Sequence, residues 1–495
     1  MVPEPPLGRA QLFIGGERSP PTSGVYAALR DPSTGAPLGE VAQGTTVDVD
    51  RALEAAERAA ESWAETPAYR RARLLRDVAQ RVLEDREGLA HLIAREVGKP
   101  IRDARAEAER AAEVFRLAAE QCRLLTGESF PADAYERPAG NEHRMLFTVR
   151  DPIGVVVAIS PFNFPLNLLA HKVAPALAAG NPVVAKPTSA APFTALRLID
   201  HLVAAGLPSG VLNVVLGAGG AVGDRLVDHP ATRLVTFTGS TAVGQRIAER
   251  AGRGLKRVIL ELGGLDPFIV LEDAPWPATL ADATRGAFGY SGQVCTASKR
   301  FIVTEAVADR FARELASAAD RLRVGPALEE TTEVGPVIDA AALDRLDALV
   351  TDASAHHANV LAGGGRAAGM PGHFFRPTVL DHVVSDARVA QEEPFGPVAP
   401  ILRVRDEDEA IRVANATPYG LQASVYTTDI RKAFRVAKRI RTGGVHINDP
   451  TTLRWDALPF GGVKSSGLGR EGLRYAMEEM TDLKLISINF GAANP

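Results

Sequence analysis

Residues 154–188, GVVVAISPFNFPLNLLAHKVAPALAAGNPVVAKPT, place two short β-branched runs on either side of an apolar segment with helical composition. The runs at 154–161 and 181–188 have the composition of buried strands, and the segment at 167–180 that of a buried helix. The same alternation continues as far as residue 264. Strands that alternate with helices predict an α/β fold with a parallel, doubly wound sheet, which binds ligands at the carboxyl ends of its strands.

The bulk composition is that of an ordinary globular chain and argues against several classes of protein. The chain has 495 residues, of which 46% are hydrophobic and 23% charged, with a formal net charge of -4. Single cores stop growing at roughly 250–300 residues, so we expect two or three domains. The small net charge argues against a nucleic acid or a membrane surface as a partner.

Membrane spans, leader segments and disulfides are not expected. No apolar run reaches the ~18 residues that would cross a bilayer. The start of the chain, MVPEPPLGRAQLFIGGERSP, lacks the charged, apolar and small-residue order of a signal peptide. Two cysteines, Cys122 and Cys295, are too few for a disulfide framework. The sequence therefore predicts a cytoplasmic protein with reduced thiols.

Three further parts of the chain differ in their pattern. Residues 48–123 repeat apolar positions three or four apart, which predicts helices. After about residue 265 the alternation of strands and helices returns, which predicts a second α/β domain. The segments MLFTVRDP (145–152) and LKLISINF (483–490) alternate apolar and polar residues. We expect these two segments to form a β arm that pairs with another subunit.

Two glycine-bearing turns follow strands of the first α/β region. LGAGGAVGD (216–224) lacks the small third residue of a dinucleotide fingerprint, because Val222 occupies that place, and we interpret it as a structural turn. FTGSTAVG (237–244) is the better candidate, since it opens a helix whose free N–H groups can receive a phosphate. Lys186, at the end of a neighbouring strand, suits a ribose hydroxyl or a phosphate. Together they predict a nucleotide-like ligand.

Three polar side chains in this sequence can perform chemistry together. Cys295 lies among small and polar residues in YSGQVCTASKR, with Lys299 four residues on, which suits an accessible thiolate nucleophile. Glu261 ends a strand directly before two glycines and could act as a general base. Asn163 lies between two phenylalanines and could donate to an oxyanion.

These stretches occur in an order that resembles the aldehyde dehydrogenase superfamily over roughly residues 10–490. The motifs that carry the resemblance are PFNFP (161–165), KPT (186–188), FTGSTAVG (237–244), ELGG (261–264), GQVC (292–295), EEPFGPV (392–398) and LPFGGVKSSGLGREG (458–472).

The resemblance implies an NAD(P)-dependent oxidation of an aldehyde to its carboxylic acid. Cys295 would attack the carbonyl, Asn163 and the backbone N–H of Cys295 would hold the oxyanion, and Glu261 would activate the water that hydrolyses the thioester. Glu393 would hold the nicotinamide ribose, and Phe395 would pack near it. The remaining positions that would contact the cofactor are Ser160, Pro161, Phe162, Lys186, Thr188, Ser189, Gly239, Ser240, Gly244 and Leu262.

The same resemblance implies three structural parts and no metal site. The NAD(P)-binding domain is expected from residues 1–128 and 150–262, and the catalytic domain from 263–462. The oligomerisation arm is expected from 129–149 and 478–495 and would join the chain into a homodimer or homotetramer.

One departure from the family pattern bears on the cofactor. Many NAD-preferring relatives carry a glutamate three residues after the strand-end lysine, where it would repel a 2′-phosphate. Ser189 stands at that place here. We therefore expect NADP to be at least accepted, with Lys186 and Thr188 as contacts to the phosphate.

The substrate is expected to be a small hydroxylated or anionic aldehyde. The chain looks like the subgroup that holds lactaldehyde, non-phosphorylating glyceraldehyde-3-phosphate and semialdehyde dehydrogenases. Arg454 would suit such an aldehyde, and Arg285 is a second candidate that we expect more to pack than to bind. The positions expected to form the substrate wall are Phe164, Leu168, His171, Val294, Thr296, Arg454, Trp455 and Phe460.

Three alternatives remain open at this point. A CoA-acylating enzyme shares the fold, but such relatives commonly lack the glutamate that Glu261 supplies. A non-catalytic binding protein would be free to lose Cys295, Glu261 or Asn163, and all three are retained. A thiol–disulfide redox protein usually needs a Cys-x-x-Cys pair, whereas Cys122 lies in a distant helical segment and is expected to pack in a core.

Overall fold

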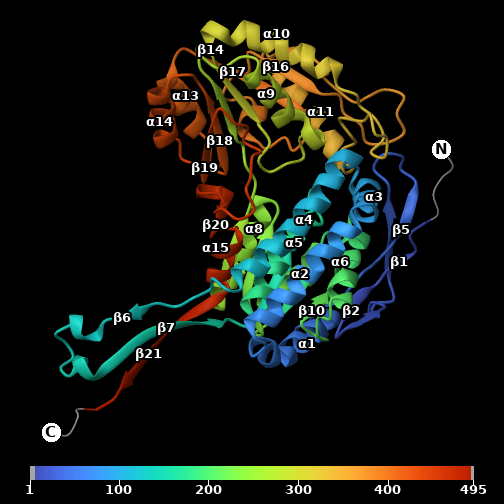
Figure 1. Cartoon of the computed structure of the whole chain (residues 1–495). Helices are drawn as coiled ribbons and strands as arrows, with labels where there is room; N and C mark the ends of the chain where they lie inside the picture. The colour runs from blue at the N-terminus through green and yellow to red at the C-terminus, as the bar shows by residue number, and fades with distance from the viewer. Residues whose placement is uncertain (1–5, 492–495) are drawn as a thin grey trace.

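The computed structural model describes residues 6–491, which form two α/β bodies and a projecting β arm (Figure 1). The first body contains an eight-stranded sheet in the order β20-β12-β11-β8-β9-β10-β2-β3. Its parallel strands are β8 (Val155–Ile159), β9 (Val183–Lys186), β10 (Leu212–Val214), β11 (Thr232–Thr238) and β12 (Arg257–Glu261). Three strands pair antiparallel with their neighbours: β20 (Gly467–Leu468) at one edge of the sheet, and β2 (Leu12–Ile14) followed by the edge strand β3 (Glu17–Ser19) on the other side.

Helices cover both faces of this sheet, because successive residues of its strands point in opposite directions. Val156 and Ala158 of β8 pack into one apolar cluster with helices α2 to α6, while Val155 and Val157 pack with α1, α7 and α8 on the other face. The helices of this body are α1 (Thr46–Ala64), α2 (Ala68–Glu84), α3 (Arg86–Val97), α4 (Ile101–Gln121), α5 (Asn167–Ala179), α6 (Pro192–Ala204), α7 (Gly219–Asp228), α8 (Thr241–Arg253) and α15 (Leu473–Glu479).

The strand order reverses between β8 and β11. The chain places β9 and β10 on one side of β8 and places β11 and β12 on the other. A crevice at the carboxyl ends of the strands forms at such a point. The segments that leave these two strands begin at Ser160 and Gly239, which are both in the predicted cofactor set.

The second body is built on a seven-stranded sheet in the order β15-β16-β17-β14-β13-β18-β19, parallel except for β15. The strands are β13 (Pro267–Val270), β14 (Arg300–Thr304), β15 (Asn359–Ala362), β16 (Thr378–Asp381), β17 (Val398–Val404), β18 (Gln422–Tyr426) and β19 (Gly444–Ile447). Its helices are α9 (Ala278–Phe288), α10 (Glu305–Arg321), α11 (Ala340–Ala355), α12 (Arg388–Gln391), α13 (Glu407–Asn415) and α14 (Ile430–Arg439).

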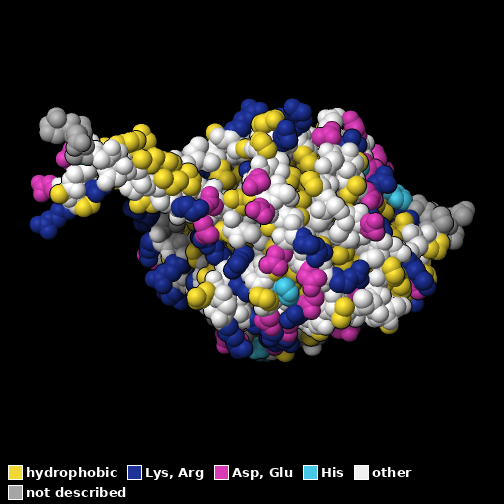
Figure 2. All heavy atoms as spheres, turned by 90° about the horizontal axis from the view of Figure 1, so that it is seen from below, with side chains coloured by type: hydrophobic (Ala, Val, Ile, Leu, Met, Phe, Trp, Pro, Cys, Tyr) yellow, Lys and Arg dark blue, Asp and Glu magenta, His cyan; other side chains and the backbone are white. Residues whose placement is uncertain are grey.

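The arm is a three-stranded antiparallel sheet that extends away from both bodies (Figure 1). It consists of β6 (Ser129–Phe130), β7 (Arg144–Pro152) and β21 (Thr481–Asn489). Figure 2 shows hydrophobic side chains along the visible face of the arm. The exposed large apolar residues of these strands and of the segment after β21 are Met145, Leu483, Leu485, Ile488 and Phe490.

Three features of the observed elements bear on the predicted division into domains. The arm strand β7 runs to Pro152, past the expected end of the arm at residue 149. β20 lies after the expected end of the catalytic domain at 462, and it pairs with β12 of the first sheet. Strands β1 (Arg9–Ala10), β4 (Tyr26–Arg30) and β5 (Pro37–Ala42) form a small sheet of their own. The division into domains stays a prediction, and its residues 1–5 and 492–495 lie outside the described range.

No helix within residues 6–491 is long and apolar enough to cross a membrane.

Candidate active site

Cys295 lies on a tightly held loop between α9 and β14. Tyr290 and Ser291, which precede it, both adopt the left-handed backbone region, with φ of 46° and 55°. Residues with a Cβ occupy this region only where the surroundings impose it. Here the Ser291 hydroxyl donates to the carbonyl of Gly335 at 2.7 Å, and the Gln293 amide bonds the backbone of the same segment. The loop therefore presents Cys295 in one defined position.

Gly292 is required in this loop for two reasons. Its φ is +68°, and a Cβ there would lie 2.1 Å from the carbonyl oxygen of Gly396. That carbonyl belongs to the EEPFGPV segment, so the absence of a side chain lets the segments of Cys295 and Glu393 approach closely. Gly292 therefore serves the close packing of these two segments.

Cys295 opens into a cavity of about 230 Å³. Six of the eight residues predicted for the substrate wall line it: Phe164, Leu168, Val294, Thr296, Arg454 and Phe460. Arg285 lines it as well, which favours the binding alternative that the sequence ranked second. Lining residues that the sequence did not single out are Lys99, Asp103, Ala106, Glu107, Arg110, Asn167, Gly289, Tyr290 and Thr452.

His171 and Trp455 are not among the residues that line this cavity. His171 is buried, and its Nε2 lies 2.9 Å from Oδ1 of Asp456. One guanidinium nitrogen of Arg454 lies 3.4 Å from the same ring, so His171 supports Arg454 from behind. Trp455 is 54% exposed.

Arg454 is buried between acidic partners and an aromatic ring. Its Nη2 donates to Glu471 at 3.0 Å, and its guanidinium carbon lies 3.9 Å from the centre of the Phe460 ring. Its Nε has no hydrogen-bond partner in the part of the chain that the structure describes. That Nε is itself buried and lies 3.7 Å from Oδ1 of Asp456, so Arg454 contributes to the cavity wall as a cation already paired with two carboxylates.

The Cys295 thiol differs from the accessible thiolate that the sequence predicts. The residue is only partly exposed. Burial raises the pKa of Cys295 to about 12, Lys299 opposes this, and Glu261 and Glu393 add to it. Ionisation of the thiol therefore depends on the charges placed around it.

Glu261 is buried at the end of β12, and neither carboxylate oxygen has a hydrogen-bond partner within the described residues. Burial raises its pKa well above the ordinary value, and the nearby Glu471 adds to the shift. A carboxyl group with a raised pKa accepts protons near neutral pH, as a general base must.

Behind Glu261 lies a buried network that sequence reasoning missed. Lys172 Nζ donates to Glu471 at 2.8 Å and to Thr238 at 2.7 Å. Burial opposes ionisation of Glu471, but Lys172 and Arg454 hold the pKa of Glu471 below its ordinary value. The sequence signal for this network was Lys172, a lysine inside the mostly apolar helix α5.

Asn163 is fixed at the entrance to the sheet crevice. Its amide Nδ2 donates to the carbonyl of Gln293 at 2.9 Å, which ties it to the loop of Cys295. The second N–H of the same amide remains available to a ligand oxygen.

The crevice at the strand ends has features that fit a dinucleotide. Lys186 is almost fully buried and has no ion-pair or hydrogen-bond partner among the described side chains, and burial lowers its pKa to about 8. An orphaned cation at this place can receive a hydroxyl or a phosphate. Ser189 lies beside it, and its hydroxyl donates to the carbonyl of Gly217 at 3.1 Å.

The helix that follows β11 supports the same interpretation. α8 begins at Thr241 after Ser240, and no side chain within the described range caps its first turn. Its N–H groups are therefore free for an anion. A Cβ on Gly244 would lie 2.3 Å from a methyl group of Leu262, so glycine keeps this turn close to the strand end.

On the opposite wall, Phe395 and Phe162 meet edge to face, with their ring centres 5.8 Å apart. Glu393 lies next to this pair and is ion-paired with Lys299. The residues present thus fit a nicotinamide dinucleotide from its adenosine end at Lys186 to its nicotinamide end at Glu393.

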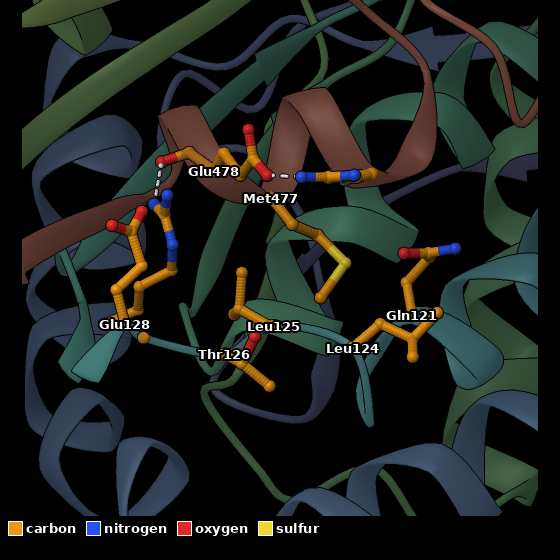
Figure 3. Close-up of a pocket in the computed structure, with 10 residues that line it drawn as sticks. Gln121, Leu124, Leu125, Thr126, Glu128, Met477 and Glu478 are labelled. Atoms are coloured by element: carbon orange, nitrogen blue, oxygen red, sulfur yellow. Dashed lines mark hydrogen bonds and ion pairs between the residues drawn. The ribbon is translucent and has the colours of Figure 1, made fainter. Parts of the chain in front are cut away.

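A second hollow, of about 170 Å³, lies where α4 and α15 meet the base of the arm (Figure 3). Arg474 donates to Glu478 at 2.8 Å within α15, and Arg150 donates to the carbonyl of Glu478 at 3.4 Å. No residue that lines it also lines the Cys295 cavity among the described residues.

Fold and site together define an α/β protein with a cysteine at a cavity and a crevice at the carboxyl ends of its parallel strands. The Aldehyde dehydrogenase family matches residues 21–486. Glutarate-semialdehyde dehydrogenase of Pseudomonas putida is 38% identical over 483 residues, covering 98% of both chains. Lactaldehyde dehydrogenase of Methanocaldococcus jannaschii is 40% identical over 446 residues, covering 89% of this chain and 93% of the relative.

A solved structure gives the same answer. NADP-dependent glyceraldehyde-3-phosphate dehydrogenase from Bacillus halodurans, complexed with NADP, superposes with a TM-score of 0.94 at 39% identity and covers 98% of this chain and 100% of its own. The chain belongs to the aldehyde dehydrogenase family. The predicted α/β fold, the resemblance and the assignment as an NAD(P)-dependent aldehyde oxidoreductase are confirmed.

Proposed function

We propose that the protein oxidises an aldehyde to its carboxylic acid through a covalent adduct on Cys295 that water then hydrolyses. The observation that carries this proposal is the position of Cys295 at a cavity beside a buried, unpaired Glu261. In this proposal the first sheet holds the cofactor, and the second body supplies the nucleophile.

The first step forms a bond between the Cys295 sulfur and the carbonyl carbon, and the thiol proton passes to water. The carbonyl oxygen becomes an oxyanion, which the free amide N–H of Asn163 and the backbone N–H of Cys295 stabilise. A bound nicotinamide supplies the acceptor for the hydride that leaves the same carbon. Loss of the hydride restores the C=O bond and leaves a thioester on Cys295.

The second step hydrolyses the thioester. Glu261 takes a proton from water, the resulting hydroxide attacks the carbonyl carbon, and the C–S bond breaks. The products are the carboxylic acid and a Cys295 thiolate. The network of Lys172, Glu471 and Arg454 surrounds Glu261 with opposing charges, which sets how readily Glu261 holds that proton.

Cys295→Ala tests the covalent route. We expect formation of reduced nicotinamide to fall by about 10⁴-fold or more, because the remaining groups cannot replace a nucleophile. Cys122→Ala is the matched control, since this second thiol is buried and donates only to the carbonyl of Ala178 at 3.7 Å. Turnover that survives in Cys295→Ala would contradict the mechanism.

We propose further that NADP is accepted as well as NAD. Lys186 is unpaired, and the hydroxyls of Thr188 and Ser189 lie next to it in sequence, so no carboxylate at position 189 faces a 2′-phosphate. The relative from Bacillus halodurans, whose structure holds NADP, supports this. Comparing kcat/KM for the two cofactors is the test, and a hundredfold preference for NAD would contradict it. We expect Ser189→Glu to lower kcat/KM for NADP about tenfold while sparing NAD.

The substrate that we propose is a small aldehyde with a hydroxyl or an anionic group. Arg454, Arg110 and Arg285 line the cavity, and only Asp103 and Glu107 oppose them there. The aldehydes in the names of the three relatives above carry a carboxylate, a hydroxyl or a phosphate, which supports this choice.

A panel of aldehydes shows which group at the far end of the substrate the cavity prefers: anionic, hydroxylated or apolar. Lactaldehyde, glyceraldehyde 3-phosphate, succinic and glutaric semialdehydes are compared with hexanal and benzaldehyde in wild type and Arg454→Met. We expect the variant to lose at least about tenfold more kcat/KM on the anionic members than on hexanal, because the loss of its charge near Glu261 and Cys295 affects every substrate alike. Equal losses on hexanal would show that Arg454 serves the fold rather than the substrate.

The arm supports a proposal about assembly. Its strands and the segment after β21 together expose five large apolar side chains, and no other element of the described chain covers the thin sheet. We propose that a second copy of the chain covers them, in a dimer or a dimer of dimers. Sedimentation of wild type and Leu485→Glu distinguishes this from a monomer.

A further inference from the structure

Lys299 contacts both the nucleophile and the carboxylate expected to bind ribose. It lies four residues after Cys295, directly before β14, and its side chain is only 3% exposed. Its ammonium donates to the carbonyl oxygen of Cys295 and lies 3.1 Å from Oε1 of Glu393. A single buried cation therefore bridges two segments that meet only in the folded chain.

The two oxygens of Glu393 have different surroundings. Oε1 faces Lys299 and also accepts from the backbone N–H of Gly264 at 3.4 Å. Oε2 lies 2.7 Å from the place where Gly263 would carry a Cβ, and it has no hydrogen-bond partner within residues 6–491. Lys299 thus fixes one oxygen and leaves the other free to accept from a ligand hydroxyl.

A second carboxylate lies close to the same cation. Asp266 is 1% exposed, and neither of its oxygens has a hydrogen-bond partner in the described part of the chain. A methyl group on Gly264 would lie 2.8 Å from Oδ1 of Asp266 and 2.9 Å from the carbonyl oxygen of Cys295. Asp266 therefore approaches the carbonyl that Lys299 holds. Burial raises the pKa of Asp266 to about 7, and Lys299 is the main opposing charge.

We propose that Lys299 is a positioning residue that couples Cys295 to Glu393, and that Asp266 is the buried acid that balances its charge. This inference rests on the proposed function in taking Glu393 as the ribose acceptor. Lys299 holds the carbonyl of Cys295, and with it the orientation of the reactive loop. The same ammonium favours the thiolate, whereas Asp266 weakens its effect.

Alkylation of Cys295 by iodoacetamide measures the first half of the coupling without turnover. The reaction follows the thiolate fraction, so its dependence on pH reports the charges around the sulfur. Lys299 and Arg454 favour the thiolate, while Glu261 and Glu393 oppose it. We expect Lys299→Met to slow alkylation about tenfold at fixed pH, which corresponds to a rise of one unit in the thiol pKa.

Asp266→Asn should change the alkylation rate in the opposite direction to Lys299→Met. Removing this acid leaves the Lys299 charge less compensated, so alkylation should become about two- to threefold faster at the same pH. Lys299→Arg keeps the charge and should restore most of the rate. Cys295→Ala gives the background from Cys122.

Cofactor binding measures the second half. Quenching of protein fluorescence by NADP gives a Kd, which we expect to weaken about fivefold in Lys299→Met because Glu393 loses its anchor. Lys299→Arg should bind within about twofold of wild type, and Asp266→Asn should change Kd little.

Unchanged alkylation and unchanged Kd in a folded Lys299→Met would overturn the inference. So would slower alkylation in Asp266→Asn, which remains informative if Lys299→Met does not fold. The failure of the proposed function looks different: wild type would oxidise no aldehyde in the panel, while the two Lys299 and Asp266 variants would still shift alkylation in opposite directions.

Discussion

Two pairs of carboxylates in this molecule are buried to a similar extent, but only one pair is surrounded by hydrogen-bond donors. Glu96 and Glu107 are each 1% exposed, as is Asp266, and Glu261 is 3% exposed. Glu96 accepts from the N–H groups of Phe193 and Thr194 at the start of α6, and Glu107 accepts from those that open α5. Glu261 and Asp266 accept no hydrogen bond within the described residues.

The difference separates structure from chemistry. A buried carboxylate is costly unless donors surround it, and the helical region supplies them through α5, α6 and Lys99. At the crevice between the two bodies the donors are missing. Burial raises the pKa of Glu96 to about 7 even among its donors, as it does that of Asp266, so the unpaired oxygens distinguish the crevice carboxylates and the pKa does not. Unpaired buried groups of this kind mark sites that exchange protons or bind ligands.

The largest expected effect comes from Glu261→Gln. Loss of the base should slow steady-state turnover by about 10²- to 10⁴-fold. One equivalent of reduced nicotinamide should still form rapidly, because only hydrolysis needs Glu261. Stopped-flow absorbance separates the two phases. The melting temperature should stay the same or rise, since the variant removes an unpaired charge next to Glu471. A clear fall would mean that Glu261 stabilises the fold, as Glu96 and Glu107 do.

Glu107→Gln should lower the stability of the fold and leave the hydrolysis step unimpaired. Removing this charge leaves Lys99 buried without its ion-pair partner, and breaking such a pair costs ~3–5 kcal/mol. Chemical denaturation measures the loss of free energy of unfolding. At a temperature where the variant is fully folded, a two-phase time course like that of Glu261→Gln would mean that Glu107 belongs to the chemistry instead.

The pH dependence should sharpen the comparison. Cys295 and Glu261 both act in their deprotonated forms, and both have raised pKa values. The rate of each step should therefore rise with pH, by up to about tenfold per unit below the governing pKa. Profiles of kcat in wild type check this. A kcat that falls steadily from about pH 6 to pH 9 would have the wrong sign.

Glu96→Gln should have the smallest effect of these changes. Its amide can accept only through one oxygen, and its NH₂ group would face N–H donors at the start of α6, which costs ~1–3 kcal/mol. Thermal unfolding measures the change. Its kcat/KM at a temperature where it is folded should equal that of wild type.

The parts of the fold and of the candidate site that have a local sequence signal could be predicted from the sequence. Runs of Val, Ile and Ala gave β8 and β9, and the helix expected at 167–180 is α5 with Gly180 in the left-handed region at its end. Cys295, Glu261 and Asn163 stood out because each is a polar or reactive side chain in a loop or at the end of a strand. Whether they act as proposed awaits the experiments above.

The rest depends on contacts that no local pattern contains. β20 is only two residues long and becomes a strand through its pairing with β12. Lys99 and Glu107 lie in a charged stretch that has the composition of a solvated helix, yet packing buries both. The links of Lys299 to Glu393 and of His171 to Asp456 join distant segments, so only the fold reveals them.

The arm has a consequence for how the chain is made. Its strand β21 is the last element, and Lys484 pairs with Asp151 across 333 residues of sequence. Until β21 has been synthesised and has emerged from the ribosome, β7 has an open edge and the arm is incomplete. Both α/β bodies can complete their sheets earlier, apart from the edge strand β20, since domains fold as units during synthesis. In the proposed assembly, subunits would therefore join through the arm only after β21 has been made, when both α/β bodies can already have folded.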